Sequence, residues 1–385
     1  MRLPRRDARL RGQGRRAADP ARPSRRPGAR ARARTRARSP VSDYDLKHHG
    51  DLEVAPGLLD LAVNVRGAAP PAWLRGRLER ALDRLGSYPD PAAATAAAAR
   101  RHDRSADEVL VTAGAAEAFA LVARALRPRR AVCVHPSFTE PEAALRAAGH
   151  GVERLVLAPP YVLDPEVVPA DADLVVVGNP TNPTGVLHER LAELCRPGRV
   201  VVVDEAFADA VPGEPHSLAG RGDLPGLVVV RSLTKTWALA GLRVGYLLAP
   251  RELVEQLRSV QPLWAVSTLA LVALETCLAP GPVRTAERDA AVLAVERDRL
   301  QSALEAAGVE VAPGSRAPFL LCRAPGRPDV RESLRAGGIA VRRGDTFPGL
   351  TAEHWRTAVR DAPASDRLVE AVREVLSSAP GRRSA

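Results

Sequence analysis

One lysine has an unusual place in this sequence. Of the 56 lysine and arginine residues, only Lys47 and Lys235 are lysines. A lysine amine can lose its proton and form an imine with an aldehyde, whereas an arginine side chain can do neither. Lys235 follows an apolar run, while Lys47 lies in a polar stretch. We therefore expect the chain to use Lys235 for the chemistry of its amine.

Three other polar motifs precede Lys235 along the chain, and each follows an apolar run. A glycine-led turn opens a helix, an Asn/Pro-rich turn follows, and a third run ends in an acidic pair. An arginine lies eight residues beyond Lys235. The motifs are Gly114-Ala115-Ala116-Glu117, Asn179-Pro180-Thr181-Asn182-Pro183-Thr184-Gly185, Asp204-Glu205-Ala206-Phe207 and Ser232-Leu233-Thr234-Lys235 with Arg243.

The elements around these motifs predict an α/β fold. Short Val/Leu-rich runs at 108–112, 130–135, 173–178, 199–203, 227–231 and 242–248 suit strands buried on both faces. Helical segments alternate with them, which is typical of a mostly parallel sheet. Ligands of such sheets bind beyond the carboxyl ends of the strands. The four motifs are therefore expected to meet at one edge of the sheet.

Together the motifs resemble those of the class I/II aminotransferases, over about residues 41–377. The resemblance implies pyridoxal phosphate (PLP) fold type I, with a seven-stranded sheet in a large domain and a smaller α+β domain. It also implies PLP as the cofactor and Lys235 as the residue that holds its aldehyde. We predict a basic tail at 1–40, an N-terminal arm at 41–67 that joins the small domain, a large domain at 68–283 and a small domain at 284–378.

The resemblance assigns a role to each cofactor-binding position. Asp204 would keep the ring nitrogen protonated, which makes the ring an electron sink. The phosphate would bind the helix amides at Gly114, Ala115 and Ala116, the Ser232 and Thr234 hydroxyls, and the Arg243 charge. Asn182 would contact the ring hydroxyl and Phe138 would stack on the ring. Phe207 stands where many members have a tyrosine, and it cannot donate that hydrogen bond.

The resemblance also implies substrate-binding residues and a dimer. Arg356 matches an arginine that binds the substrate carboxylate, with Arg360 as the alternative register. Tyr88 matches a tyrosine that reaches the PLP phosphate of a neighbouring subunit, which predicts a homodimer with shared active sites. His49, Asn64 and Arg342 are candidates for binding a phosphorylated substrate.

Within the family, the chain is most similar to the histidinol-phosphate aminotransferase group. Its arm and its Arg342-to-Leu350 segment resemble the enzyme of cobalamin biosynthesis that decarboxylates L-threonine O-3-phosphate. We therefore expect threonine-phosphate decarboxylation, with transamination of histidinol phosphate or another amino acid as the alternative. A non-catalytic DNA-binding regulator is the remote third reading.

Composition limits the remaining possibilities. Residues 1–40 hold fifteen arginines against Asp7 and Asp19, which leaves a net charge of about −2 on the rest. Such a tail lacks the apolar spacing of an ordered element and is expected to be a disordered extension or the product of a mis-called start codon. A nucleic-acid or anionic-surface arm and a targeting peptide are the alternatives, although the tail lacks an aromatic nucleic-acid platform. Four widely spaced cysteines predict no metal site and a reducing cytoplasm. No apolar run reaches the length of a membrane span.

Overall fold

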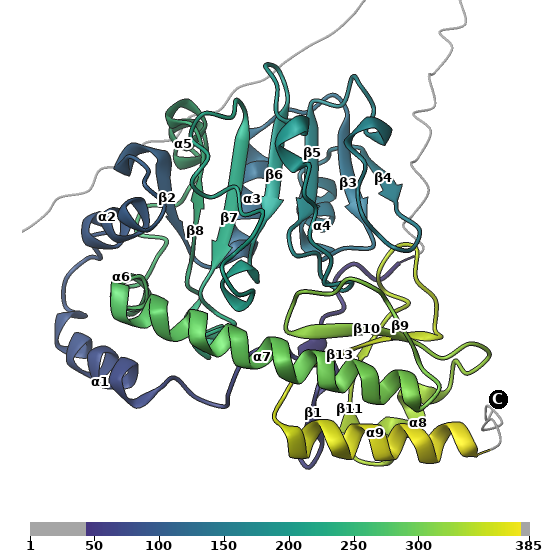
Figure 1. Ribbon diagram of the computed structural model, residues 1–385. Coiled ribbons are helices and arrows are strands. Elements are labelled where there is room, and N and C mark those ends of the chain that lie inside the picture. Colours follow the sequence, from purple (N-terminus) through teal and green to yellow (C-terminus); the bar gives the residue numbers. More distant parts are fainter. Residues whose placement is uncertain (1–43, 379–385) are drawn as a thin grey trace, which may run out of the picture. The chain divides into compact units, whose positions relative to one another are not determined.

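A seven-stranded sheet forms the centre of the protein (Figure 1). The computed structural model describes residues 44–378, so the predicted basic tail lies outside the described residues. The strand order is β2-β8-β7-β6-β5-β3-β4, with parallel neighbours except β8, which runs antiparallel to β2 and β7. The strands are β2 (Val109–Thr112), β3 (Ala131–His135), β4 (Val152–Val156), β5 (Leu174–Gly178), β6 (Val200–Asp204), β7 (Leu227–Ser232) and β8 (Gly245–Leu248). The predicted mostly parallel α/β fold is confirmed.

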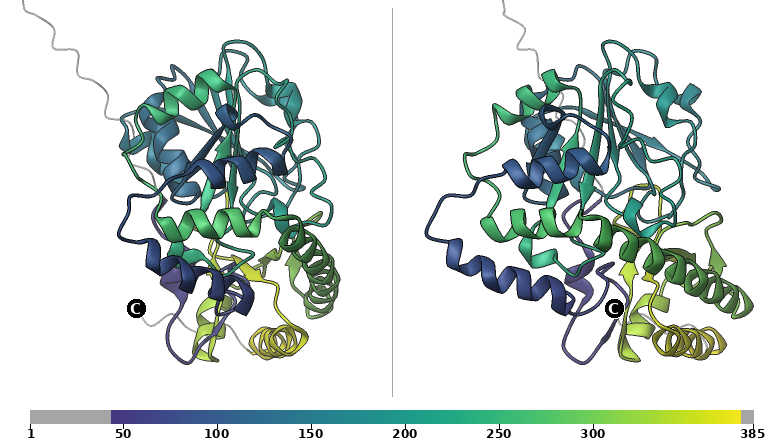
Figure 2. Two further views of the ribbon diagram at one scale, coloured as in Figure 1. Left: turned by 90° about the vertical axis from the view of Figure 1, so that its left-hand side faces the viewer. Right: turned by 60° about the vertical axis from the view of Figure 1, so that its left-hand side comes forward.

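Both faces of this sheet are covered, which explains its continuous apolar strands. In β5, Val175 and Val177 pack into one core while Leu174 and Val176 pack into another, as the two-residue period of a strand requires. One core includes residues of α1 (Ala72–Ala81), α2 (Ala92–Arg101) and α6 (Thr268–Cys277). The other includes residues of α3 (Ala115–Ala125), α4 (Glu140–Ala147) and α5 (Arg251–Arg258). Figure 2 shows these helices from two further sides.

The sequence analysis missed strand β4. Its residues, Val-Glu-Arg-Leu-Val, are half-buried or exposed, because β4 lies at the edge of the sheet and pairs only with β3. An edge strand tolerates charged side chains that a central strand would exclude. A search for continuous apolar runs therefore could not find it.

The spacing of Leu74, Leu78, Leu82 and Leu85 predicts one helix over residues 70–85, but the structure has a shorter one. Helix α1 ends at Ala81, and a 3-10 turn follows over Leu82–Arg84. Leu74 is buried, but Leu82 and Leu85 are more than half exposed. The prediction that these leucines share one buried face was wrong, because the 3-10 turn changes the angular spacing of the residues.

The C-terminal part has its own small sheets and core. One antiparallel sheet has the order β12-β13-β10-β9, and a two-stranded sheet pairs β1 with β11. Its strands and helices are β1 (Leu59–Asp60), β9 (Glu310–Val311), β10 (Phe319–Arg323), β11 (Ile339–Ala340), β12 (Arg342–Arg343), β13 (His354–Ala358), α7 (Pro280–Ala306), α8 (Val330–Ala336) and α9 (Ala362–Ser377). Helix α7 runs from beside α6 to this part (Figure 1).

The N-terminal arm packs on this second part. Leu59 of β1 pairs with Ile339 of β11, and Leu61 is buried in the core formed with α7, α8 and α9. This pairing agrees with an arm that joins the small domain, and the domain boundaries themselves stay a prediction. None of the helices in residues 44–378 combines the length and apolarity that a membrane crossing needs.

Candidate active site

A cavity of about 500 Å³ lies where the central sheet, the arm and the C-terminal part meet. Asp204 and Ser232 end β6 and β7, which run parallel to each other, and both residues line the cavity. Lys235 follows three residues after Ser232 and also lines it. The motifs therefore meet at the carboxyl edge of the sheet, as predicted.

The two central ionisable groups of the cavity have shifted pKa values. Burial, together with the charges of Arg356 and Arg243, lowers the pKa of Lys235 to about 8, against the opposing charge of Asp204. Burial raises the pKa of Asp204 to about 6, although the Ala206 N–H donates to its Oδ1 at 3.0 Å and Lys235 opposes the rise. An amine that can be neutral near physiological pH can act as a nucleophile or as a base.

One corner of the cavity has the features of a phosphate site. Gly114 caps the N-terminus of α3 with φ +77°, and a Cβ there would lie 2.8 Å from Nη2 of Arg243. A side chain at this position would thus strain the backbone and displace the arginine. Ser232 and Thr234 bring their hydroxyls within 2.8 Å of each other. A helix N-terminus, hydroxyls and a guanidinium together favour an anion.

Two buried arginines form the opposite wall. Arg356 on β13 is 5% exposed and Arg342 on β12 is 2% exposed. Arg356 donates to Oδ1 of Asn182 at 2.7 Å and to the Ala62 carbonyl, and its guanidinium lies 5.4 Å from the centre of the Phe319 ring. Arg342 donates to the His48 carbonyl and the Thr346 hydroxyl.

Neither of these arginines has a carboxylate partner among residues 44–378. Burial, together with the positive charges of Arg342 and Arg360, lowers the pKa of Arg356 to about 9. Burial likewise lowers the pKa of Arg342 to about 10. Burying an unpaired charge is costly, so this wall is suited to an anionic ligand.

Asn64 supports the same interpretation. Both atoms of its side-chain amide are buried, and neither has a hydrogen-bond partner in the described part of the chain. Buried polar groups are nearly always hydrogen-bonded, so an unsatisfied amide that lines a cavity points to a ligand. Arg360, the alternative register for Arg356, donates instead to the Val63 carbonyl and lines a smaller neighbouring cavity.

Aromatic side chains form the remaining walls. The rings of His49 and Phe138 lie 5.3 Å apart, and Nε2 of His49 is 3.6 Å from Oε2 of Glu140. Phe207 packs edge-on against Phe319 at 5.0 Å and offers no hydrogen bond. The sequence analysis did not find Glu140, because a glutamate that opens a helix is ordinary in a sequence.

Tyr88 does not line the cavity of its own chain. Its side chain is 75% exposed, and its ring stacks on Trp264 at 4.2 Å. The prediction for Tyr88 concerns a neighbouring subunit, so its role stays a prediction.

Comparison with known sequences identifies the class of protein to which this fold and cavity belong. The family model described as "Aminotransferase class I and II" matches residues 57–372. The chain belongs to the class I and II aminotransferases, as the motifs predicted, and its cofactor is pyridoxal phosphate.

Three relatives show where in the family the chain lies. It is 52% identical over 333 residues to a histidinol-phosphate aminotransferase of Mycobacterium bovis, covering 85% of this chain and 90% of the relative. It is 33% identical to a threonine-phosphate decarboxylase of Salmonella typhimurium, covering 83% and 92%. The solved histidinol-phosphate aminotransferase of Clostridium acetobutylicum superposes with a TM-score of 0.75 at 25% identity, covering 83% and 99%.

The residues present fit pyridoxal phosphate. Asp204 is a partly buried carboxylate with a raised pKa, and a protonated ring nitrogen would give it a cationic partner. The corner of Gly114, Ser232 and Arg243 suits a phosphate, and Lys235 lies in the same cavity to hold an aldehyde. Arg342 and Arg356 on the opposite wall are then available to bind a second anionic ligand.

Proposed function

We propose that this protein is a PLP-dependent aminotransferase of a phosphorylated amine, of the histidinol-phosphate type. The observation that supports the substrate class is the pair of buried arginines, Arg342 and Arg356, which have no carboxylate partner within residues 44–378. The 52% identical relative named as a histidinol-phosphate aminotransferase favours transamination over the decarboxylation that the arm motifs predict.

We assign the following roles to the residues of the cavity. Bound pyridoxal phosphate supplies an aldehyde that condenses with amines and a ring that withdraws electrons from the carbon bearing the amine. Lys235 holds the aldehyde between turnovers and, once released, moves the proton of the substrate α-carbon. Asp204 in its ionised form keeps the ring nitrogen protonated. Ala115, Ala116 and Arg243 hold the cofactor phosphate, while Ser232 and Thr234 add hydroxyls.

The remaining positions orient the substrate. Arg356 and Arg342 bind the anionic group of the substrate. The buried side-chain amide of Asn64 forms hydrogen bonds with the same substrate. The same pair can bind the carboxylates of a 2-oxo acid in the second half of a transamination, because both amino donors and acceptors are anions. Asn182 accepts from Arg356 and lines the same cavity, so it would contact the ring hydroxyl of the cofactor. Phe138 would stack on the ring, and the His49 ring lies 5.3 Å from the Phe138 ring.

The test is a paired assay on the cofactor-loaded enzyme. With histidinol phosphate and 2-oxoglutarate we expect glutamate and no carbon dioxide. Replacing histidinol phosphate by unphosphorylated histidinol is expected to reduce kcat/KM at least a hundredfold, because the buried arginines would lose their partner. Equal activity toward both amines would refute the phosphate assignment.

A second function is favoured by the number of unpaired arginines. Histidinol phosphate has one anionic group, whereas L-threonine O-3-phosphate has both a carboxylate and a phosphate. Two buried guanidiniums would match two anions. Incubation with threonine phosphate alone would distinguish the functions, because release of carbon dioxide without consumption of a 2-oxo acid would establish decarboxylation.

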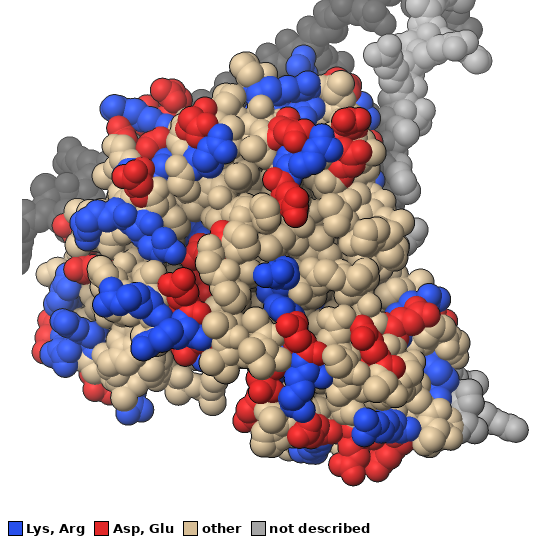
Figure 3. All heavy atoms as spheres, viewed as in Figure 1, with Lys and Arg blue, Asp and Glu red and all other residues tan. Residues whose placement is uncertain are grey.

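We also propose a homodimer and a cytoplasmic location. Leu263 and Trp264 are 78% and 55% exposed beside the exposed Tyr88, which gives the chain an apolar surface suited to a second copy. On the face in Figure 3, basic and acidic side chains are interspersed, so we propose no nucleic-acid partner. Size-exclusion chromatography with light scattering would test the dimer, and a Tyr88→Phe variant would test its contribution to cofactor affinity.

A further inference from the structure

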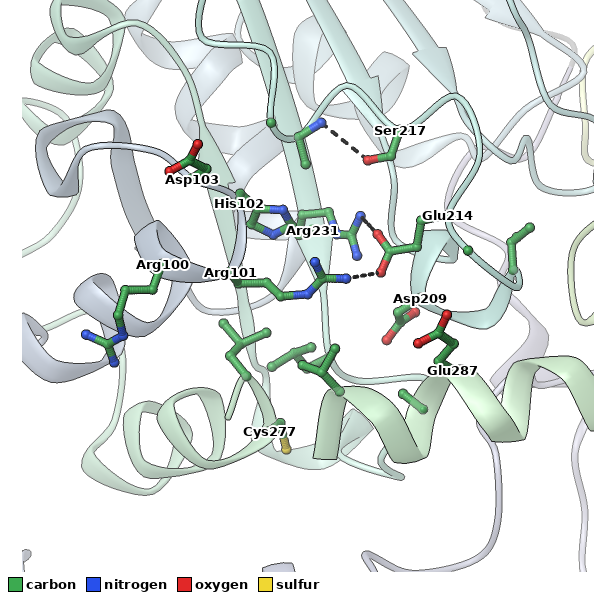
Figure 4. Close-up of a pocket in the computed structure, with 18 of the residues that line it drawn as sticks. Arg100, Arg101, His102, Asp103, Asp209, Glu214, Ser217, Arg231, Cys277 and Glu287 are labelled. Carbon is green, nitrogen blue, oxygen red and sulfur yellow. Dashed lines mark hydrogen bonds and ion pairs between the residues drawn. The ribbon is translucent and has the colours of Figure 1, made fainter. Parts of the chain in front are cut away.

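A second cavity, of about 550 Å³, lies on another side of the sheet (Figure 4). It shares no lining residue with the candidate active site. The end of α2, the loop that follows β6, and the start of α7 surround it. Its size is that of a small-molecule site.

Three of the charged groups around this cavity are paired, namely Arg101, Glu214 and Arg231. Arg231 donates to Oε2 of Glu205 at 3.0 Å and to Oε2 of Glu214 at 2.7 Å. Arg101 donates to the other oxygen of Glu214 at 2.7 Å, a contact that Figure 4 also shows. His102 lies 2.8 Å from the Tyr246 hydroxyl, and burial lowers its pKa to about 2, so it is neutral.

Asp209 has no such ion pair among the described residues. Both of its carboxylate oxygens are buried, and neither has a hydrogen bond of regular geometry, although the Thr236 hydroxyl lies near enough to lower its pKa. Burial nevertheless raises that pKa to about 6, against the charge of Arg231. The carboxylate is therefore ionised at pH 8, buried, and without a cationic partner of its own.

Glu287 on α7 brings a second carboxylate to the same cavity. No hydrogen bond or ion pair links it to another described residue. Figure 4 shows Asp209 and Glu287 on one side of this cavity and Arg100 on the other side. Apolar side chains complete the wall, among them Trp237 and Leu278. The described residues contain no group of three ligands suited to a metal ion.

We propose that this cavity binds a small organic cation, an ammonium group with an N–H donor on a short apolar body. The ammonium group lies between Asp209 and Glu287, where it compensates the buried charge of Asp209. The apolar body packs against Trp237 and Leu278. The proposal does not rest on the substrate of the catalytic cavity, although Asp209 also lines the smaller cavity that Lys235 and Asn64 border.

A tertiary amine tests this site without interference from the cofactor. N,N-dimethylphenethylammonium keeps one N–H donor, but a tertiary amine cannot form an imine with an aldehyde. Calorimetric titration of the cofactor-loaded enzyme at pH 8 is expected to show one amine per chain, with the cofactor absorbance unchanged. The uncharged ether of the same shape, 2-methoxyethylbenzene, is expected to bind at least tenfold more weakly.

Two variants locate the amine. Glu287→Gln, at an exposed position that is expected to fold normally, and Asp209→Asn should each weaken binding at least tenfold. Glu370→Gln removes an exposed carboxylate of α9 and should leave the affinity unchanged. Absence of a saturable signal at millimolar amine would overturn the proposal. So would wild-type affinity in Glu287→Gln, or binding that changes the cofactor absorbance, because the amine would then lie in the catalytic cavity.

Discussion

Replacement of Asp204 by asparagine is expected to stabilise the cofactor-free protein while it impairs the loaded enzyme. The pKa of Asp204 rises from its ordinary value of 3.8 to about 6 in the folded state. A raised carboxylate pKa means that ionisation opposes folding. The contribution of the protonated Asp204 carboxyl group to the free energy of unfolding is therefore complete below pH 3.8, and it is lost as the pH rises through 6.

The size of the effect follows from the shift. Two pKa units correspond to about 3 kcal/mol, and water in the cavity is expected to reduce this to about 2 kcal/mol. Asparagine has the same shape, and its oxygen can still accept from the Ala206 N–H. The unfolding free energy of cofactor-free Asp204→Asn should thus exceed that of the wild type by about 2 kcal/mol at pH 8, and by roughly half as much at pH 5.

Urea unfolding at one protein concentration measures both values. Asp209→Asn is the matched control, because burial raises its pKa to about 6 as well but it lies outside the catalytic cavity. Both variants should be stabilised without cofactor, and only Asp204→Asn should lose cofactor and turnover. If Asp204→Asn destabilised the cofactor-free protein at pH 8 and retained the cofactor, Asp204 would be a structural hydrogen-bond acceptor instead.

Three further predictions concern the same cavity. Arg356→Lys keeps the charge but loses the planar fork of the guanidinium. The loss of about 2–4 kcal/mol of transition-state binding should lower kcat/KM roughly 30- to 1000-fold. Arg360→Lys should change kcat/KM less than fivefold. The reverse order would favour the Arg360 register. Lys235→Arg should show neither the absorbance of lysine-bound cofactor nor turnover, and cofactor loading of the wild-type apoprotein should accelerate as the pH rises through about 8. Gly114→Ala should weaken cofactor affinity at least tenfold in equilibrium titrations, because its Cβ would displace Arg243.

The central sheet could be predicted because its strands are buried on both faces. The apolar run Val200–Asp204 predicts a parallel interior strand, and in the structure it lies between β5 and β7. β4 and the end of α1 could not be predicted in the same way. Their residues face water on one side, so the packing of neighbours decides their structure more than their own pattern does.

The catalytic motifs were predictable for a different reason. Asp204 ends a strand, and Gly114 and Lys235 come two and three residues after one, so the sheet fixes where they lie. Arg342 and Arg356 come from the C-terminal part, and nothing in the sequence shows that they are buried without carboxylate partners. Asp209 was missed because an aspartate five residues after Asp204 looks like an ordinary loop residue.

The positions of the unpaired charges connect these observations. Arg231 and Arg101 together balance the charges of Glu205 and Glu214, so this group of ion pairs needs no ligand. Arg342, Arg356, Asp204 and Asp209 are not balanced in this way, and each lines a cavity. A folded chain retains such groups at a cost in stability, since burial disfavours each isolated charge. Ligands of opposite charge remove that cost, so the sign of each unpaired group predicts its ligand: anions at the two arginines, and cations at the two aspartates.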